Sequence, residues 1–561
     1  MKVQLQNHQN YPIRKQNNPQ TLAGETQPSF KGFSGALNYF ATNMGVGACA
    51  TDLGFMVIPR TANEIPRGFD AAAEAGFRES LGTTNHAAIG LYGLAGGTLL
   101  GGALASEYGI KANKIFTSPE RVEALAKFWA EHIEKNTSQK DYLTKIVDEI
   151  AGYNTTRAEG STFVKIAKED KEKIVNILDE VINNDKDFDI MKKDTMKKWR
   201  KSNERGILTA LITESTGAET RIKLNAGGVS DSATLMDDIV AMTKSFKKEK
   251  VTAQFIEAAN GNGNKFLRTM SKFNKGRALV GFLVGSGIGL SVQPLNMWIT
   301  KKRTGKTGFV GGAENCGKDT STKFLLERLG VATAMGAMVL ATLKCSPKDF
   351  LNKMAFKGMA PTLDQLKGIY GTTILGRVMV TRSEDELRES AVKDTCGFLS
   401  WLVLGDFVNR GVAHAFYGKK LWNYNKEIDG NQFTSSALKS RNEILREALR
   451  GVGISTITKD AKTGLDKAMG IDEMIKELQN NPLAKNIKKA TCKKLWALNV
   501  AQIAGYAFTG LALGAGIPML NIHMTRRAEA KRREKAEQMH LMAEQNNGVK
   551  LANTELEAQR A

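Results

Sequence analysis

The stretch RALVGFLVGSGIGLSVQPLNMWITKKRTGK, residues 277–306, decides how the rest of the chain is interpreted. Its 23 positions from 278 to 300 carry no charged residue. A helix of this length and apolarity can cross the hydrocarbon core of a bilayer. Gly281, Gly285 and Gly289 recur at every fourth position and share one helix face, where small residues let two backbones approach closely. The stretch therefore predicts a membrane-spanning helix that packs against another helix.

A second stretch near the C-terminus repeats features of the first. Four residues of the first stretch have identical counterparts at one constant offset along the chain. These pairs are Gly285 with Gly510, Gly289 with Gly514, Asn296 with Asn521, and Thr300 with Thr525. Both stretches end in basic residues, which are Lys301, Lys302 and Arg303 in the first and Arg526 and Arg527 in the second. The triplet Arg78-Glu79-Ser80 also recurs as Arg388-Glu389-Ser390, each time before an apolar segment. These matches predict two related halves.

Composition places large solvated regions between the apolar segments. Hydrophobic residues make up 42% of the 561 residues, and the mean hydropathy is −0.29, which is low for a bundle of spans alone. The formal charge is +21, an excess that suits anionic lipid headgroups or nucleic acid. Because the apolar runs end in basic residues, we expect a lipid bilayer as the partner and no nucleic acid.

The periodicity divides the chain into membrane and solvated segments. We expect a disordered N-terminal tail (1–32), first-half membrane segments (33–106), a helical solvated insert (107–275), a Gly-patterned membrane helix (276–300) and a basic linker (301–328). The second half then has membrane segments (329–417), a second helical insert (418–494), a Gly-patterned membrane helix (495–525) and a charged C-terminal tail (526–561). The fold class is all-α: a polytopic helical membrane protein with charged helical inserts.

Individual segments differ in how clearly they predict a span. Residues 80–106 contain Gly93, Gly97 and Gly101 on one face and predict a membrane helix. Residues 33–58 suit a span or a re-entrant helix equally, and prolines at 59 and 66 are expected to break the chain there. The apolar run 329–343 is too short for a full crossing, so it suits a buried helix or a half-membrane hairpin better.

The inserts carry ordinary helix signals. Ser118 and Pro119 predict a helix N-cap and first helical position, and Ser440 with Glu443 forms a capping-box pattern. Strand signals are nearly absent. The size of the insert 107–275 makes it the expected surface for a protein partner, and the chain could also form a homo-oligomer.

The number of spans determines on which side of the membrane the basic ends of the two Gly-patterned stretches lie. We call these ends, Lys301 to Arg303 and Arg526 to Arg527, the basic exits. If three segments of each half cross, the second half is inverted and the two basic exits face opposite sides. If only the two longer segments of each half cross, both exits face the cytoplasm and both inserts lie on the far side. The positive-inside tendency favours four spans over six. We then expect the basic residues of both exits to lie near lipid headgroups: Lys301, Lys302, Arg303, Arg526 and Arg527.

One apolar segment carries charges. Asp406, Arg410 and His414 follow one another at four-residue intervals within 395–417. Charged groups at membrane depth tend to pair and to mark function, so these residues are either an internal structural pair or part of a gate.

No motif predicts catalysis, a cofactor or a metal ion. The six histidines lack metal-ligand spacing, and the five scattered cysteines include no CxxC pair. The N-terminus lacks the apolar core of a cleavable signal peptide, so an internal segment would direct insertion into the plasma (inner) membrane. We therefore expect a non-enzymatic permease or channel-like protein. The alternatives are a membrane scaffold that binds a partner through its inserts, and a soluble all-helical protein with buried Gly-rich helices.

Overall fold

The protein is mostly helical, in agreement with the all-α prediction. The computed structural model describes residues 40, 44–154, 166–184, 195–224, 229–308, 319–358, 360–423, 437–461 and 463–560. Helices account for 81% of the structure. The described strands form three two-stranded antiparallel ribbons: β1 (Ile222–Lys223) with β2 (Val229–Ser230), β3 (Trp422–Asn423) with β4 (Ala437–Leu438), and β5 (Ile457–Lys459) with β6 (Asp466–Ala468).

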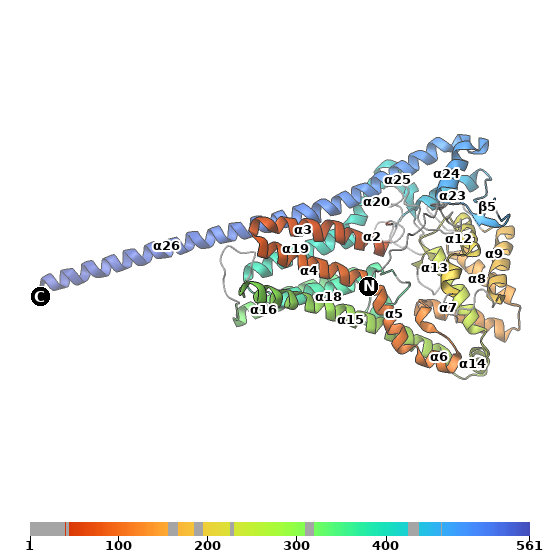
Figure 1. Ribbon diagram of the computed structural model, residues 1–561, viewed down its shortest axis with the longest axis horizontal. Helices are drawn as coiled ribbons and strands as arrows, with labels where there is room; N and C mark the ends of the chain where they lie inside the picture. The colour runs from red at the N-terminus through yellow and green to blue at the C-terminus, as the bar shows by residue number, and fades with distance from the viewer. Residues whose placement is uncertain are drawn as a thin grey trace, which may run out of the picture.

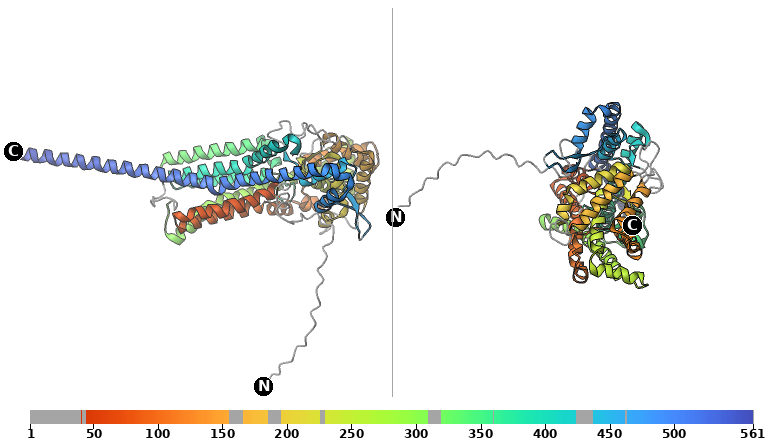
Figure 2. Two further views of the ribbon diagram at one scale, coloured as in Figure 1. Left: turned by 90° about the horizontal axis from the view of Figure 1, so that it is seen from above. Right: turned by 90° about the vertical axis from the view of Figure 1, so that its right-hand side faces the viewer.

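The molecule has three parts, which follow one another along its long axis: a helical head, a bundle and one projecting helix (Figure 1). The bundle begins with α2 (Met44–Thr51), the π-helical turn η1 (Asp52–Val57), α3 (Ile58–Glu64), α4 (Phe69–Ala87), α5 (Ile89–Leu100), α6 (Gly102–Tyr108) and α15 (Lys265–Thr304). Then come α16 (Thr322–Leu343), α18 (Leu363–Met379), α19 (Glu384–Leu399), η5 (Ser400–Leu404), α20 (Gly405–Tyr417), α25 (Lys485–Leu511), η8 (Ala512–Gly516) and α26 (Ile517–Arg560). We call the bundle helices up to α15 half one and those from α18 onward half two. The far part of α26 projects beyond the bundle as a single helix (Figure 2).

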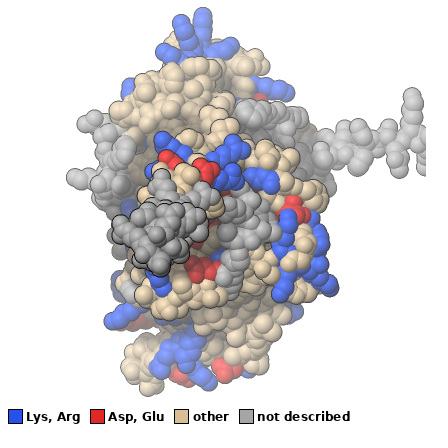
Figure 3. All heavy atoms as spheres, turned by 90° about the vertical axis from the view of Figure 1, so that its left-hand side faces the viewer, with Lys and Arg blue, Asp and Glu red and all other residues tan. Residues whose placement is uncertain are grey.

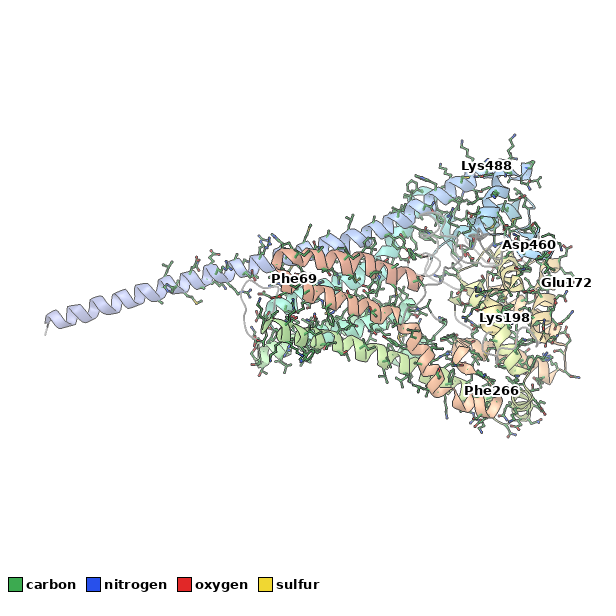
Figure 4. All side chains as sticks on the ribbon, in the orientation of Figure 1. Phe69, Glu172, Lys198, Phe266, Asp460 and Lys488 are labelled. Atoms are coloured by element: carbon green, nitrogen blue, oxygen red, sulfur yellow. The ribbon has the colours of Figure 1, made fainter. Side chains whose placement is uncertain are left out.

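Contacts between neighbouring helices fix the direction of each pass along the bundle. Asn85 and Asn296 tie α4 and α15 together in antiparallel orientation, through Gly285 and Glu74 respectively. In contrast, α18 runs parallel to α15, because Gly285 lies against Ile369 and Gly289 lies against Thr373. The chain thus runs from the head to the far end in α2–α3, α15, α18 and α25–α26, and it returns in α4–α6, α16 and α19–α20. We call the far end, where α15 finishes at Thr304, the exit end. Phe69 marks it in Figure 4, and Phe266 marks the head end of α15.

The head combines both solvated inserts. The first insert contributes α7 (Pro119–Glu134), α8 (Gln139–Asn154), α9 (Lys168–Asn183), α11 (Thr195–Arg200), α12 (Asn203–Thr216), α13 (Ser232–Phe246) and α14 (Glu249–Ala259), and the second contributes α23 (Arg441–Gly451) and α24 (Ile471–Asn480). The Glu443 carboxylate accepts a hydrogen bond of 2.6 Å from the Glu219 backbone, which joins the two inserts. Both predicted caps are confirmed: Ser118 accepts from the backbone N–H of Arg121, and Ser440 with Glu443 forms a complete capping box.

Helix α16 is longer than the apolar run predicted. It begins at Thr322, inside the expected basic linker, and spans 22 residues. Ser321 caps it by accepting a hydrogen bond from the backbone of Phe324. Lys323 and Glu327 pair along its first turns at 3.6 Å, so these charges belong to a helix face and not to a linker.

The first pass also differs from expectation at its prolines. Pro59 lies inside helical structure as the second residue of α3, directly after the π-helical turn η1. Such a turn disrupts the regular hydrogen-bond ladder, so a residue without a backbone N–H is tolerated there. The break comes instead after Pro66, at Gly68, whose φ of 112° is left-handed.

Several bundle helices are apolar on surfaces that other parts of the chain leave uncovered. Three helical segments, Lys265–Thr304, Thr322–Leu343 and Pro482–Ala543, are long and apolar enough to cross a membrane; the bent pair Ile89–Leu100 and Gly102–Tyr108 would make a fourth. Large side chains on these helices are exposed, including Leu99 (76%), Leu283 (57%), Leu326 (63%) and Leu511 (70%).

Candidate functional site

The glycines of α15 face α18. A Cβ atom added to Gly285 would lie 2.6 Å from Ile369, and one added to Gly289 would lie 2.3 Å from the Thr373 hydroxyl. Gly281 lies against the ring of Phe356 in the same way, at 2.5 Å. These positions therefore accept no side chain without movement of a neighbour.

The glycines of the C-terminal stretch make matching contacts with the first pass. A Cβ atom added to Gly510 would lie 2.9 Å from the Phe55 ring, and one added to Gly514 would lie 3.2 Å from Pro59. Phe55 and Pro59 are one helical turn apart, as are Ile369 and Thr373, which make the corresponding contacts with α15. The last pass of each half thus packs on the first pass of the other half.

The glycines of α5 and its C-cap lie in different surroundings. Gly93 lies against Phe356, with an added Cβ 2.4 Å from its ring. Gly97 lies against Asn113 and the side chain of Arg277, at 3.1 and 3.4 Å. Gly101 meets the Gly97 carbonyl oxygen of its own helix at 2.7 Å.

The predicted polar residues of α20 form a local pair. Arg410 contacts Asp406 at 3.0 Å, one turn away on the same helix. The Asp406 side chain is 46% exposed, whereas that of Arg410 is 3% exposed. His414 packs instead beside Trp422, with ring centroids 5.5 Å apart.

The main concentration of buried charge lies elsewhere, among residues that were not predicted as site residues. Three neighbouring groups of ion pairs contain six basic residues (Arg60, Arg67, Arg78, Arg377, Arg382, Lys393) and six acidic ones (Glu64, Glu74, Glu79, Glu386, Glu389, Asp394), and we call these twelve residues the charged network. They come from α3 to α4 in half one and from α18 to α19 in half two.

Glu79 is the centre of the network. Its carboxylate lies 3.1 Å from Arg60, 3.6 Å from Lys393 and 3.8 Å from Arg377. Arg377 also contacts Asp394 at 2.9 Å. All five groups are buried, so each charge depends on its partners for stabilisation.

Two ion pairs cross between the halves in a reciprocal pattern. Arg67 of half one contacts Glu389 of half two at 2.6 Å, and Arg382 of half two contacts Glu74 of half one at 2.7 Å. The two arginines are separated along the chain by the same number of positions as the two glutamates.

The same glutamates receive matching backbone contacts. The Asn296 amide donates to the Glu74 carbonyl and the Asn521 amide donates to the Glu389 carbonyl, each at 2.9 Å. In this pattern Glu389 corresponds to Glu74, whereas the repeated triplet matches Glu389 to Glu79. The matching contacts of Glu74 and Glu389 therefore do not follow the pairing of the repeated triplet.

A pocket of about 40 Å³, with room for a few water molecules, lies between α4 and α19. Its lining includes corresponding positions of the two helices, namely Ala71 with Glu386, Glu74 with Glu389, Ala75 with Ser390, and Arg78 with Lys393; Glu64, Arg377 and Asp394 complete it. Glu74 Oε2 and Asp394 Oδ2 are buried and have no hydrogen-bond partner among the residues that the structure describes. These free carboxylate oxygens can accept a hydrogen bond or bind a cation.

The pocket lies on the exit side of the centre of the uncharged stretch. Asn85 is level with Gly285 and Glu74 is level with Asn296, so the pocket residues of α4, from Ala71 to Arg78, are level with positions 299 to 292 of α15. The centre of the uncharged positions 278–300 is residue 289, about 4 to 15 Å away along the axis, and Glu79 is level with position 291, about 3 Å from that centre.

Sequence analysis missed this site because it searched for identical residues and uncharged windows. The informative signal is chemical similarity at one constant offset: Glu74, Arg78, Glu79 and Gly82 correspond to Glu389, Lys393, Asp394 and Gly397. No group of three or more His, Cys, Asp or Glu side chains in the described ranges is placed to hold a metal ion.

Comparison with protein-family models, with curated proteins and with solved structures finds no match for this chain. The bundle, the charged network and the pocket are therefore the features from which a function can be inferred.

Proposed function

We propose that this chain is an integral membrane transporter with seven passes and that the pocket between α4 and α19 is its solute site. The observation that carries the proposal is a pocket lined by charged residues of two passes within an apolar bundle, among them Glu74 with Glu389 and Arg78 with Lys393. Intramembrane charges are costly and commonly mark ion or substrate pathways.

The exposed apolar surfaces support membrane insertion. A soluble core would bury residues such as Leu283, Leu326 and Leu511, which are more than half exposed here. The passes α4, α18 and α19 carry charges, and the most deeply buried of these, such as Glu79, Arg377 and Asp394, face one another in the charged network. Six basic and six acidic residues leave that network formally neutral, which lowers the cost of placing it inside a bilayer.

The reciprocal contacts support an origin from two related halves. Each half would contribute three passes, α2–α3, α4–α6 and α15 in one and α18, α19–α20 and α25–α26 in the other. Because α16 adds one further pass between them, the two halves run in the same direction, as in parallel transporter repeats. Both basic exits then lie on one side, where Lys and Arg gather around the end of the molecule (Figure 3). The positive-inside rule assigns that side to the cytoplasm.

The two-half arrangement also suggests how solute would move. The crossed ion pairs Arg67–Glu389 and Arg382–Glu74 hold α4 and α19 together toward the exit end, on either side of the pocket. Rocking of one half against the other would break or remake both pairs at once. This motion would alternate access to the pocket.

Thiol accessibility tests the proposal. In a chain whose five cysteines have been replaced, Ser390→Cys places one thiol in the pocket lining. We expect a membrane-impermeant maleimide to label it from the exit side. Leu283→Cys, on the exposed apolar face of α15, is the matched control that should stay unlabelled, and Lys302→Cys should label from the exit side alone. Failure of S390C to label from either side would mean that the pocket is closed to water, and the transporter proposal would fall.

A membrane scaffold is the second candidate, and one observation favours it. Equal numbers of acidic and basic residues in ion pairs are what a purely structural link between two halves requires. An unlabelled S390C, together with specific capture of a partner by the full-length chain but not by one with charge-reversed α8 and α9, would support the scaffold.

A further inference from the structure

A buried imidazole lies between the charged network and the head. His86 on α4 is 2% exposed, and its Nδ1 lies 2.8 Å from Oδ2 of Asp52 on η1. Its Nε2 has no hydrogen-bond partner among the described residues, although buried polar atoms are normally satisfied. Asp52 opens a π-helical turn, a feature that is frequent at functional sites.

Aromatic residues from half two enclose this imidazole. The ring centroid of Tyr370 on α18 lies 5.4 Å away, and that of Trp401 on η5 lies 5.5 Å away. Trp401 is held in place by its Nε1, which donates to the Ala48 carbonyl at 3.0 Å. The titratable groups around the His86 ring are thus Asp52 from η1 and Tyr370 from α18, and Cys49 from α2 lies beside Asp52.

Tyr370 connects the imidazole to the charged network. Its buried hydroxyl has no hydrogen-bond partner within the described part of the chain. A Cβ atom on Gly397 would lie 3.7 Å from this hydroxyl and 2.8 Å from Nη2 of Arg60, so the two groups share one small space. Arg60 in turn contacts Glu79 at 3.1 Å.

These groups follow one another along the bundle axis. His86 is seven positions from Glu79 on α4, and Glu79 is five positions from Glu74. At the rise of an α-helix these steps are about 10 and 8 Å, so protonatable side chains recur at short intervals from Asp52 to the pocket. A series of Asp, Glu and His residues within a membrane bundle is typical of a proton relay.

We propose that Asp52, His86 and Tyr370 extend the pocket into a proton path through the bundle. The inference rests on the proposed function and adds that the pocket between α4 and α19 transports protons. His86 Nε2 accepts a proton arriving from the pocket, and Nδ1 releases one to the Asp52 carboxylate. The ring stays neutral overall and changes tautomer, a turn of the ring presents the unprotonated nitrogen to the pocket again before the next proton arrives, and Asp52 passes its proton to water on the side of the head. Water carries the proton between groups that lie beyond hydrogen-bond distance.

Proton flux into liposomes tests the path with the proton itself as the probe. The full-length protein is reconstituted with an entrapped pH-sensitive dye, and a potassium diffusion potential drives the flux. We expect wild type to conduct and His86→Gln to conduct at least about tenfold less. Glutamine can still donate to Asp52 but cannot relay a proton. Asp406→Asn, which alters the separate ion pair of α20, should retain wild-type flux.

A second readout reports on the His86 tautomer without flux. In protein labelled with ¹⁵N-histidine, the ring nitrogens of His86 are identified by the loss of their signals in H86Q. In wild type these nitrogens should exchange between the two neutral tautomers. A single fixed tautomer in wild type would overturn the inference, and so would equal proton flux in wild type and empty liposomes.

Thiol labelling separates the two proposals. If S390C labels from the exit side while wild type conducts no protons, the solute site stands and the proton path falls. If S390C does not label from either side, the proposed function falls, and the proton path that rests on it falls as well.

Discussion

At the scale of single residues, substitution of Glu389 is expected to lower the stability of the folded protein. Glu389 contacts Arg67 at 2.6 Å, and the Thr525 hydroxyl donates to the same carboxylate. Glu389→Gln would leave Arg67 with only Glu64, at 3.2 Å. Loss of one partner of a buried pair costs about 3–5 kcal/mol, so the melting temperature of the solubilised protein should fall by several degrees.

The exposed pair Arg303–Asp70 is the matched control for that substitution. Both side chains are about one-third exposed, so Asp70→Asn should cost under about 1 kcal/mol. Equal melting temperatures for E389Q and D70N would show that the crossed pair does not hold the halves together. The double variant Arg67→Met with Glu389→Leu should recover part of the loss, since both charges of the crossed pair are then removed and only the less buried Glu64 loses its partner.

A pH dependence is expected from Asp238 in the head. Burial raises the pKa of Asp238 to about 6, against the hydrogen bonds that it accepts from Arg121 and Thr117. The folded head therefore binds a proton between about pH 4 and 6 that the unfolded chain releases. This contribution to stability is complete below about pH 4 and is lost as the pH rises through 6, and it amounts to at most about 3 kcal/mol.

Thermal unfolding of the full-length protein, followed by near-ultraviolet circular dichroism between pH 4 and 7, measures this effect. Asp238→Asn imitates the protonated carboxyl and should make the unfolding of the head less dependent on pH in that range. The exposed Asp141 supplies the control, because Asp141→Asn should leave the slope between pH 4 and 6 as in wild type. An unchanged slope in D238N would assign the dependence to another group.

At the scale of elements, the contact between α15 and α18 depends on glycine. Gly285 faces Ile369, whereas Gly287 on the same helix has open space around its Cα. Gly285→Leu should therefore destabilise the solubilised protein by at least about 1–3 kcal/mol, while Gly287→Leu should be tolerated. Size-exclusion profiles and melting temperatures of the two variants measure the difference. Partial rescue of Gly285→Ala by Ile369→Ala would confirm that this contact is the cause; equal effects of G285L and G287L would argue against it.

The elements that sequence analysis could predict were those whose signal is local. The 23 uncharged positions of α15 and the caps at Ser118 and Ser440 need no knowledge of distant residues. Helices α4, α18 and α19 lie within the segments predicted to be membrane segments, 33–106 and 329–417, but they were not predicted as separate passes, because hydropathy penalises charges such as Glu79 and Arg377. These two residues pair with each other although they belong to different halves of the chain, so only the fold shows that the charges are compensated. For the same reason the charged network was missed, and the more conspicuous Asp406–Arg410 pair was selected instead.

At the scale of the whole molecule, α16 sets the relation between the halves. With α16 as a full pass, the two halves run in the same direction and both basic exits share one side. Without it, the second half is inverted and the exits lie on opposite sides. The direction of α16 is fixed by its partners: Arg328 near its start donates to Met379 at the exit end of α18, and Lys367 near the head end of α18 donates to Thr342.

Labelling of single exposed cysteines in a cysteine-free background shows on which side of the membrane each position lies. Lys302→Cys and Arg527→Cys should react with an impermeant reagent from one side of sealed vesicles, and Lys127→Cys in the head should react from the other. The deciding position is Lys348, just beyond the C-terminal end of α16. Seven passes place Lys348→Cys on the side of the head, whereas a half-membrane hairpin returns it to the side of Lys302. Labelling of K348C together with K302C would therefore remove α16 as a pass and, with it, the parallel arrangement on which the shared pocket of α4 and α19 depends.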